Sequence, residues 1–542
     1  MGKGNLKWSL VMVLQVAFLW AAKGQDRYMV FFSDKDNVPY SLEQPDAFLS
    51  DRAIARRSAQ GIAITVQDLP VDTEYVAQVE GEGADVFFTS RWFNAALVQM
   101  DDTQRISVTN LPFVDSVTYI AKGAVLSHDL GGYEVPQDFL DPDRVSGNSH
   151  TQLTMLGAKD MHEDGFTGEG KVIAVFDAGF PGVNVYKPFE HIFTENRLIG
   201  TKDFIRNSGN VFQYNAHGTA VLSCIGGMYE EVFSGTAPDA SYILCVTEDV
   251  ENEYRIEEYN WLLAAEYADS AGADVINASL GYSTFSDGSM DYTYQDMNGK
   301  NTIVARAASY AADRGIVVVV SAGNEGNGSW KYITSPGDAD DVLTVGSVDS
   351  RYERSGFSSF GPTADGRIKP DVSAMGTFTS IFTVGQSRGE VVSGMITTGN
   401  GTSFAAPQIA GFAAATWQAN PDWNSQQVIE SIKLSGSNAD EPNSEIGYGV
   451  PKYESEVPGA FTVYPNPFKD NMIFVEFGNV EIKGRLTIDL QDTKGNKIFS
   501  TKLSARDRLD RIEIEVKPSE NGTYFLTLHS RGFKKTVKLI KI

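Results

Sequence analysis

Cysteine and histidine are scarce in this chain of 542 residues, which contains two cysteines and six histidines. Neither Cys224 nor Cys245 stands near a histidine at the spacing of a zinc site, so no zinc centre is expected. Whether these two cysteines form a bridge is left open, because sequence does not give their geometry. Basic residues are also few: 45 lysines and arginines face 70 aspartates and glutamates, a net charge of −25. This balance argues against nucleic acid as a partner, because phosphate binding needs clustered basic side chains.

Long apolar runs are missing too, apart from one near the N-terminus. Lys3 and Lys7 precede an apolar run over 8–22, and a small-residue stretch follows it. This order predicts a secretory signal peptide over 1–24, with cleavage after Gly24. The alternative for this run is a retained membrane anchor, but no other stretch is long enough to span a bilayer. We therefore expect an exported protein with no permanent transmembrane anchor.

The most informative stretch that is present is Gly-Thr-Ser-Phe-Ala-Ala-Pro at 401–407. Apolar residues at helical spacing follow it as far as Trp417, which predicts that Ser403 lies at a helix N-terminus with Pro407 in the first turn. Free backbone N–H groups at that position would favour an oxyanion beside the serine hydroxyl. Taken alone, the stretch is more simply interpreted as a tight loop that caps a helix.

Three further polar residues stand at the ends of predicted elements. Asp177 follows the apolar run 171–176, which is typical of a strand buried on both faces. His217 stands at a second loop-to-helix junction, and Asn324 follows a valine-rich strand predicted over 316–321. Each has a plainer interpretation on its own, as a helix cap, a solvated histidine or a turn residue. All four together, in the order aspartate, histidine, asparagine, serine, point to one catalytic site.

In these motifs and in their order the chain resembles a subtilase, a subtilisin-like serine peptidase. The matching blocks lie at 172–179, 217–219, 321–326 and 401–407, within a region of about 145–455. In such a site Ser403 is the nucleophile, His217 the general base, Asp177 the group that orients the imidazole, and Asn324 a donor to the oxyanion.

Two competing active-site schemes fit this sequence less well. An α/β-hydrolase needs its histidine after the serine, and only His529 follows Ser403, in a different predicted domain. The sedolisin relatives of subtilases use carboxylates in place of the histidine and an aspartate at the oxyanion position. His217 and Asn324 argue against that scheme.

The resemblance also implies a substrate-binding strand and some departures from the family pattern. Ser279, Leu280 and Gly281 resemble the edge strand that pairs with substrate backbone, although an ordinary edge strand would look much the same. Ala178 stands where the family commonly has serine or threonine, which puts in doubt a hydrogen bond supporting the aspartate. Ala220 replaces a second histidine often found after the His-Gly-Thr block. No cofactor is required by this chemistry; structural calcium is possible, and we can assign no ligand to it.

Pattern changes along the chain predict several domains. After the signal peptide, residues 25–125 have the size and place of a subtilase prodomain, with strands at 28–32 and 95–100 and a helix over 47–59. Residues 126–148 form a linker and maturation region, so the mature chain should begin between about Ala121 and His150. Residues 149–455 alternate strands with helices, including 257–271 and 302–314. This rhythm predicts an α/β fold: a mostly parallel, subtilisin-like sheet flanked by helices, behind an α+β prodomain.

Residues 460–542 have a different pattern. Segments such as 486–490 and 512–516 alternate polar and apolar residues with period two, further strands are expected at 524–528 and 537–542, and residues 494–496 suggest a turn. These segments predict a small antiparallel β-sandwich. Its motifs at 464–468 and 522–526 resemble the C-terminal sorting domain of type IX secretion in Bacteroidetes. A carbohydrate-binding or other β-sandwich module is the alternative.

Together these expectations describe a serine endopeptidase made as a zymogen and exported through the periplasm, then released or held at the outer cell surface. Its partners would be protein or peptide substrates and the secretion machinery. The rival interpretation is a catalytically silent surface protein that keeps the subtilase fold for binding. The side chain preferred at the scissile bond is not readable from these motifs.

Overall fold

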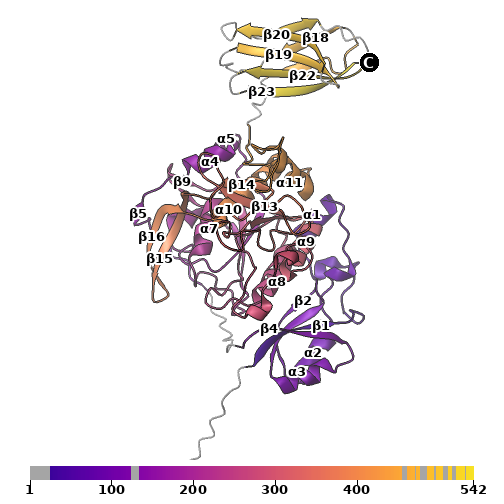
Figure 1. Ribbon diagram of the computed structural model, residues 1–542, viewed down its shortest axis with the longest axis vertical. Helices are drawn as coiled ribbons and strands as arrows, with labels where there is room; N and C mark the ends of the chain where they lie inside the picture. Colours follow the sequence, from indigo (N-terminus) through magenta and orange to yellow (C-terminus); the bar gives the residue numbers. More distant parts are fainter. Residues whose placement is uncertain are drawn as a thin grey trace, which may run out of the picture. The chain divides into compact units, whose positions relative to one another are not determined.

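The computed structural model describes residues 25–123, 133–454, 461–469, 471–476, 485–493, 496–504, 511–515, 521–530 and 533–541. The chain forms two compact units, residues 1–453 and 454–542 (Figure 1). The predicted signal peptide and the first part of the predicted linker lie outside the described residues. Within the described ranges, every helix is too short or too polar to cross a membrane.

A seven-stranded sheet forms the centre of the first unit. Its order is β14-β13-β12-β11-β6-β10-β7, and all of its pairings are parallel. The strands are β6 (Val172–Asp177), β7 (Leu198–Asp203), β10 (Ser241–Val246), β11 (Val275–Ala278), β12 (Val317–Ser321), β13 (Leu343–Val348) and β14 (Val372–Met375). The central strands are buried along their length, as a sheet covered on both faces requires. The predicted parallel sheet is confirmed.

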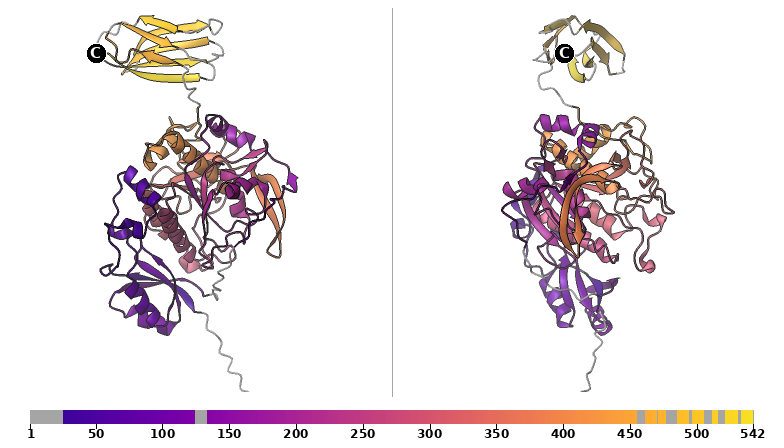
Figure 2. Two further views of the ribbon diagram at one scale, coloured as in Figure 1. Left: turned by 180° about the vertical axis from the view of Figure 1, so that it is seen from behind. Right: turned by 90° about the vertical axis from the view of Figure 1, so that its left-hand side faces the viewer.

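Helices cover both faces of this sheet (Figure 2). Alternate side chains of β6 show the division: Ile173 and Val175 belong to one core, and Val172, Ala174 and Phe176 to the other. The first core is completed by α4 (His150–Leu156), α5 (Ala158–Glu163), α7 (His217–Gly226), α10 (Thr402–Ala419) and α11 (Ser425–Leu434). The second is completed by α8 (Ile256–Ala271) and α9 (Ile303–Asp313).

Strand β6 marks the point where the strand order reverses. The chain adds β7 and β10 on one side of β6 and then β11 to β14 on the other. Asp177 ends β6 and pairs in register with Val246 of β10, while Phe176 pairs with Ala278 of β11. The loops after β10 and β11 therefore diverge around Asp177, which is where open α/β sheets place their sites.

The prodomain packs a four-stranded antiparallel sheet, in the order β2-β3-β1-β4, against α8 and α9. Its strands are β1 (Asp26–Phe32), β2 (Asp85–Ser90), β3 (Ala95–Met100) and β4 (Val114–Ala121). Helices α2 (Thr73–Gly81) and α3 (Asp102–Thr109) cover the other face of the sheet. Helix α1 (Asp51–Ala59) begins four residues later than expected, because the Ser50 side chain caps it by accepting from Ala53 N.

Part of the predicted linker is bound to the peptidase domain. Strand β5 (Arg144–Val145) runs parallel to β16 (Glu390–Gly399), which forms a hairpin with β15 (Thr379–Ser387). Backbone hydrogen bonds from Asp143 N to Gly394 O (2.7 Å) and from Ser146 N to Ile396 O (2.9 Å) extend this pairing. The linker is thus exposed yet held as a third strand.

The second unit consists of two antiparallel sheets, in the orders β17-β18-β21 and β20-β19-β22-β23. The strands are β17 (Thr462–Tyr464), β18 (Met472–Glu476), β19 (Arg485–Asp492), β20 (Lys497–Ser504), β21 (Arg511–Glu515), β22 (Gly522–Ser530) and β23 (Phe533–Lys541). One side of each sheet contributes to a shared core that includes Ile488 and Ile514. The period-two pattern thus forms the predicted β-sandwich, although most of the predicted 494–496 turn lies outside the described residues.

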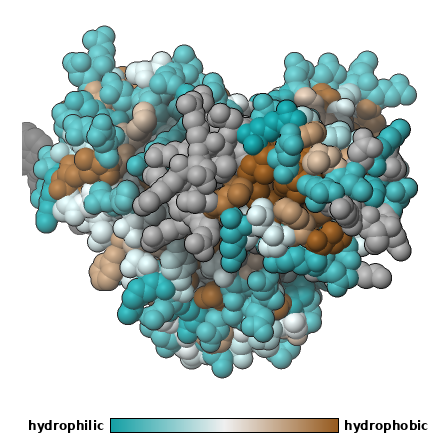
Figure 3. Space-filling model, turned by 90° about the horizontal axis from the view of Figure 1, so that it is seen from above, coloured by the Kyte–Doolittle hydropathy of each residue, from teal (hydrophilic) through white to brown (hydrophobic). Residues whose placement is uncertain are grey.

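Hydrophilic residues cover most of the face drawn in Figure 3, and hydrophobic residues form smaller patches between them. This surface suits a chain whose acidic side chains greatly outnumber its basic ones.

Candidate active site

Asp177 and His217 form a hydrogen-bonded pair at the carboxyl end of β6. The imidazole Nδ1 lies 2.8 Å from Asp177 Oδ1. The aspartate side chain is completely buried, whereas 32% of the histidine side chain is exposed. A carboxylate at Nδ1 favours the tautomer that carries its proton there, so Nε2 is left as the site that can accept a proton.

Glycine at position 218 allows this close approach. A Cβ atom at Gly218 would lie 2.4 Å from Gly179 O and 2.8 Å from the Cβ of Asp177. A larger residue would therefore push the start of α7 away from β6. Asn215 supports the same junction, because its Oδ1 accepts from His217 N at 2.9 Å.

The surroundings of His217 shift its pKa in the opposite direction from those of His162 and His191. Burial lowers the pKa of His217, but the charge and hydrogen bond of Asp177 and the charge of Glu248 outweigh it, so the pKa lies above the ordinary 6.5. Burial lowers the pKa of His162 and of His191, which lie against backbone carbonyls. Only His217 of these three has the carboxylate partner that a general base requires.

One oxygen of Asp177 is left without support. Asp177 Oδ1 accepts from Ala178 N at 2.8 Å as well as from the histidine. Asp177 Oδ2 is buried and finds no hydrogen-bond donor among the described residues. Ala178 has no hydroxyl to offer at this position, so the departure noted in the sequence coincides with an unsatisfied oxygen.

Ser403 is the second residue of α10, and Gly401 precedes the helix. The prediction that Pro407 lies in the first turn is wrong, because the helix begins at Thr402 and Pro407 lies in its interior. In a regular helix the amide at 407 would donate to Ser403 O, and proline has no N–H. Ser279 Oγ donates to Ser403 O instead, at 2.9 Å, which satisfies the carbonyl and ties α10 to the end of β11.

The hydroxyl of Ser403 is oriented towards the same segment. Ser403 Oγ donates to Ser279 O at 3.3 Å, and the residue is only 8% exposed. The neighbouring Phe404 ring lies 5.8 Å from the His217 ring, between centroids. Among the hydrogen bonds of the described residues, none joins His217 to Ser403. The structure therefore places the residue after the serine against the histidine ring, with the serine hydroxyl turned to Ser279.

Asn324 follows β12 and is anchored to the start of α10. Its Oδ1 accepts from Thr402 N at 2.9 Å and from Thr402 Oγ1 at 3.0 Å. Because two donors hold the oxygen, the side-chain NH2 is the end left over, and no acceptor among the described residues takes it. Asn324 is exposed, so this donor is accessible to a ligand.

The predicted substrate-binding segment follows β11 directly. Ser279 is buried, and Leu280 O accepts from Ser321 Oγ at 3.3 Å. A Cβ at Gly281 would lie 2.1 Å from Thr334 Oγ1, so this backbone runs close to its neighbour. The segment thus lies between β11, β12 and the serine, and its pairing with a substrate stays a prediction.

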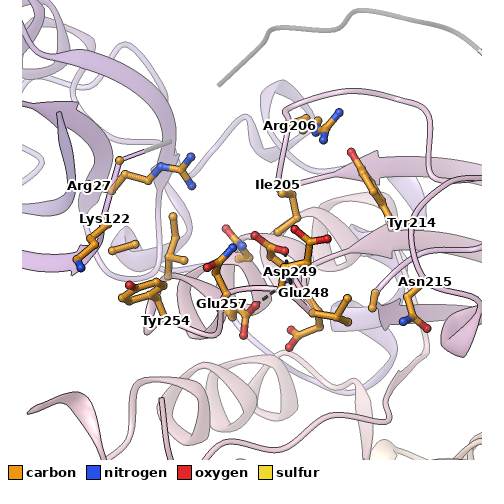
Figure 4. A pocket seen from close by; sticks show the side chains of 18 of the residues that line it. Arg27, Lys122, Ile205, Arg206, Tyr214, Asn215, Glu248, Asp249, Tyr254 and Glu257 are labelled. Carbon is orange, nitrogen blue, oxygen red and sulfur yellow. Dashed lines mark hydrogen bonds between the residues drawn. The ribbon is translucent and has the colours of Figure 1, made fainter. Parts of the chain in front are cut away.

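Sequence reasoning missed one feature of this end of the sheet, a cavity of about 710 Å³ (Figure 4). Its lining includes Ala178 and Asn215, which neighbour the catalytic candidates, and four carboxylates from the segment after β10. These carboxylates are Glu248, Asp249, Glu251 and Glu257. The signal available in the sequence was a concentration of acids directly after a core strand, which matches no motif.

No metal site is found in the described part of the chain, where no three histidine, cysteine, aspartate or glutamate side chains are grouped as ligands. Calcium therefore has no assigned position here. Cys224 and Cys245 are both buried and are not bridged.

Comparison with known families assigns each part of the chain. Residues 168–449 match the subtilase family, Peptidase S8. Residues 27–129 match the Peptidase S8 propeptide domain of Bacteroidota, and residues 462–542 match a secretion system C-terminal sorting domain. The protein is therefore made with a propeptide, and its sorting domain indicates export, to the cell surface or into the medium.

Two curated relatives support the same assignment. Serine protease AprX of Bacillus subtilis (strain 168) is 30% identical over 329 residues, covering 56% of this chain and 70% of that protein. Subtilisin NAT of Bacillus subtilis subsp. natto is 30% identical over 290 residues, covering 52% of this chain and 64% of that protein. Among solved structures, MycP1 from Mycobacterium smegmatis is similar with a TM-score of 0.43 and 23% identity, covering 58% of this chain and 90% of that one. The chain belongs to the subtilase family of serine peptidases.

Proposed function

We propose that this protein is a secreted endopeptidase that hydrolyses peptide bonds through an acyl-enzyme on Ser403. The observation that carries the proposal is the Asp177–His217 pair, with Nδ1 to Oδ1 at 2.8 Å. It leaves the Nε2 of His217 as the basic atom, close to a serine at a helix N-terminus. Proteins and peptides are the substrates this chemistry would act on.

The reaction begins with a rotation of the Ser403 side chain. Ser403 Oγ turns from Ser279 O towards His217 Nε2, which takes the hydroxyl proton as the oxygen attacks the peptide carbonyl. The protonated imidazole then gives this proton to the leaving amine, and a water molecule releases the acyl group by the reverse sequence. Asp177 holds the imidazole in the required tautomer and stabilises its positive charge.

Two hydrogen-bond donors would receive the oxyanion of the tetrahedral intermediate. The Ser403 N–H lies in the first turn of α10, where amides have no partner within the helix. The NH2 group of Asn324 is the second donor, because Thr402 already holds the carboxamide oxygen. Both are fixed before substrate arrives, which is what makes such donors effective.

Substrate backbone would lie along Ser279–Gly281. An extended peptide could add there as a further strand, with main-chain hydrogen bonds that hold the scissile carbonyl beside Ser403. In the zymogen the end of the prodomain, at Ala121–Gly123, lines the cavity beside this site. Removal of the propeptide is therefore expected before hydrolysis of other proteins.

The proposal is tested by labelling and by hydrolysis. The secreted protein should hydrolyse casein, and a serine-directed sulfonyl or phosphonyl fluoride should modify Ser403 and stop the reaction. Ser403→Ala should abolish both, whereas Ser387→Ala, an exposed serine on β15, should change neither. A folded, exported protein that is neither labelled nor active would instead be a catalytically silent binding protein.

A further inference from the structure

The cavity beside the catalytic pair is lined by an unusual group of acids. Four lining carboxylates, called the open cluster below, come from one short segment: Glu248, Asp249, Glu251 and Glu257. Among the described residues, no lysine or arginine lies within ion-pair distance of any of them. Uncompensated carboxylates beside a cavity are costly, because like charges repel and partial burial weakens their hydration.

The fold places this cluster next to the catalytic pair. Val246 at the end of β10 pairs with Asp177, so Glu248 lies two residues beyond the level of the aspartate. Glu257 extends from the first turn of α8, and its Oε1 accepts from Asp249 N at 2.8 Å. Glu248 Oε1 is held by Tyr282 Oη at 2.5 Å. These side chains are therefore positioned by specific contacts and do not simply extend into solvent.

A buried polar atom in the same wall also lacks a partner. Asn260 lines the cavity and is only 1% exposed. Its Nδ2 donates to Thr247 O at 3.1 Å, while its Oδ1 finds no donor among the described residues. An unpaired buried acceptor next to carboxylates calls for a ligand that donates hydrogen bonds and carries positive charge.

The prodomain supplies such groups in the zymogen. Arg27 of β1 and Lys122, which follows β4, line the cavity opposite the open cluster (Figure 4). Arg27 lies within electrostatic range of Asp249, whose charge raises the pKa of Arg27 against the lowering effect of burial. The peptidase domain contributes one cationic lining residue, Arg206, and its guanidinium lies over the Tyr214 ring at 5.4 Å.

The acids of this wall are also hard to ionise without a cation. Burial, followed by neighbouring carboxylates, raises the pKa of Glu248 to about 7. Burial and the charge of Glu248 raise the pKa of Glu257 to about 11. A bound ammonium or guanidinium group would favour the ionised forms and would itself be held by them.

We propose that this cavity is the subsite that selects a lysine or arginine side chain of the substrate, with Glu248, Glu257 and Asn260 as its recognition groups. The inference rests on the proposed peptidase function and adds a substrate class to it. In the zymogen Arg27 and Lys122 would occupy the place of the substrate cation. The volume of about 710 Å³ accommodates a long basic side chain.

The basic side chain should belong to the part of the substrate before the scissile bond. Ala121, Lys122 and Gly123 line the cavity, and they precede any cleavage that removes the prodomain. In the zymogen, the segment that lines the cavity therefore lies on the acyl side of that cleavage.

Matched fluorogenic peptides test this proposal on the matured enzyme. Each peptide carries either lysine or norleucine, its uncharged counterpart, at one position before the scissile bond. At one such position kcat/KM should be about tenfold higher for lysine, the effect of one charge-assisted hydrogen bond. Glu257→Gln, which keeps the bond from Asp249 N, should remove most of this ratio by lowering kcat/KM for the lysine peptide.

Two further variants keep the test decisive. Glu251→Gln alters an exposed member of the cluster and should also reduce the ratio of kcat/KM values. It serves as the test if Glu257→Gln does not mature. Glu390→Gln, an exposed acid on β16, is the matched control and should leave the ratio unchanged. Hydrolysis without a lysine preference, or a preference that survives both cluster variants, would overturn the subsite. Loss of all hydrolysis and of Ser403 labelling would instead overturn the proposed function.

Discussion

Helix α8 carries acids at both of its ends, and the two sets are treated in opposite ways by the prodomain. Near its C-terminal end, Glu266 and Asp269 form what we call the paired cluster. Asp269 is completely buried and bonds to Arg56 (2.5 Å), Arg57 (2.6 Å) and Arg91 (2.6 Å) of the prodomain. At its N-terminal end, Glu257 belongs to the open cluster and forms no ion pair with any described lysine or arginine, although Arg27 and Lys122 line the same cavity.

Glu266 shows how complete the pairing is. Its carboxylate accepts from Ser90 Oγ (2.5 Å), Arg91 N (2.9 Å) and Trp92 N (3.1 Å). A buried ionic network stabilises only when every member has its partner, and removing one partner is strongly destabilising. The two ends of α8 therefore have different roles. The paired cluster holds the prodomain in place, and the open cluster is available to bind a ligand.

The largest effect is expected from a substitution that breaks the paired cluster. In a Ser403→Ala zymogen, which cannot cleave itself, Asp269→Asn leaves three buried arginines without their shared carboxylate. We expect the free energy of unfolding to fall by about 3–5 kcal/mol, measured by urea denaturation with tryptophan fluorescence. Glu257→Gln, on the same helix, should cost far less because its carboxyl already disfavours ionisation. Equal losses in the two variants would show that the ends of α8 do not differ as described.

A smaller effect would show that only the open cluster acts on His217. The charge of Glu248 helps to raise the pKa of His217, so Glu248→Gln should lower that pKa. A histidine with a lower pKa is neutral, and hence active as a base, at lower pH. The rising limb of kcat/KM against pH should therefore move to lower pH in the mature enzyme.

The matched control for this pH profile is Glu266→Gln, in the paired cluster of α8. It should leave the profile in place. Because Glu248 itself has a pKa raised to about 7, its influence should be felt mainly above that pH. A move to higher pH, or the same move in both variants, would contradict the assignment.

The smallest expected effect concerns Asp177, which is as buried as Asp269 but less fully bonded. Ala178→Ser could supply a hydroxyl donor to the unsatisfied Asp177 Oδ2. The expected gain in the free energy of unfolding is about 1 kcal/mol, measured by the same denaturation experiment. Ala220→Ser, which also adds one hydroxyl in a buried position, is the control and should give no such gain.

Much of the fold and the position of each site residue could be predicted, because the signals are local. Asp177 follows a run of apolar residues, and Ser403 lies at the start of a helix whose period is visible over the following turns. In the same way, period-two segments predicted the C-terminal sandwich. The roles of Asp177, His217, Asn324 and Ser403 remain predictions, which the proposed labelling tests.

The features that escaped prediction depend on contacts between distant segments. Pro407 can lie inside α10 because Ser279, just after β11, donates to Ser403 O the hydrogen bond that proline cannot donate. No periodicity shows which arginine contacts Asp269, and none shows that Glu248 lies two residues beyond the level of Asp177. That level follows from the register of β10 on β6, which only the assembled sheet defines.

The short ladder between Arg144–Val145 and β16 has a consequence for the enzyme after activation. Any cut made upstream of Asp143 leaves this ladder on the peptidase side of the break. The new N-terminus would then remain hydrogen-bonded to the hairpin. The edge of β16 would stay covered and would not be available for strand pairing with other chains.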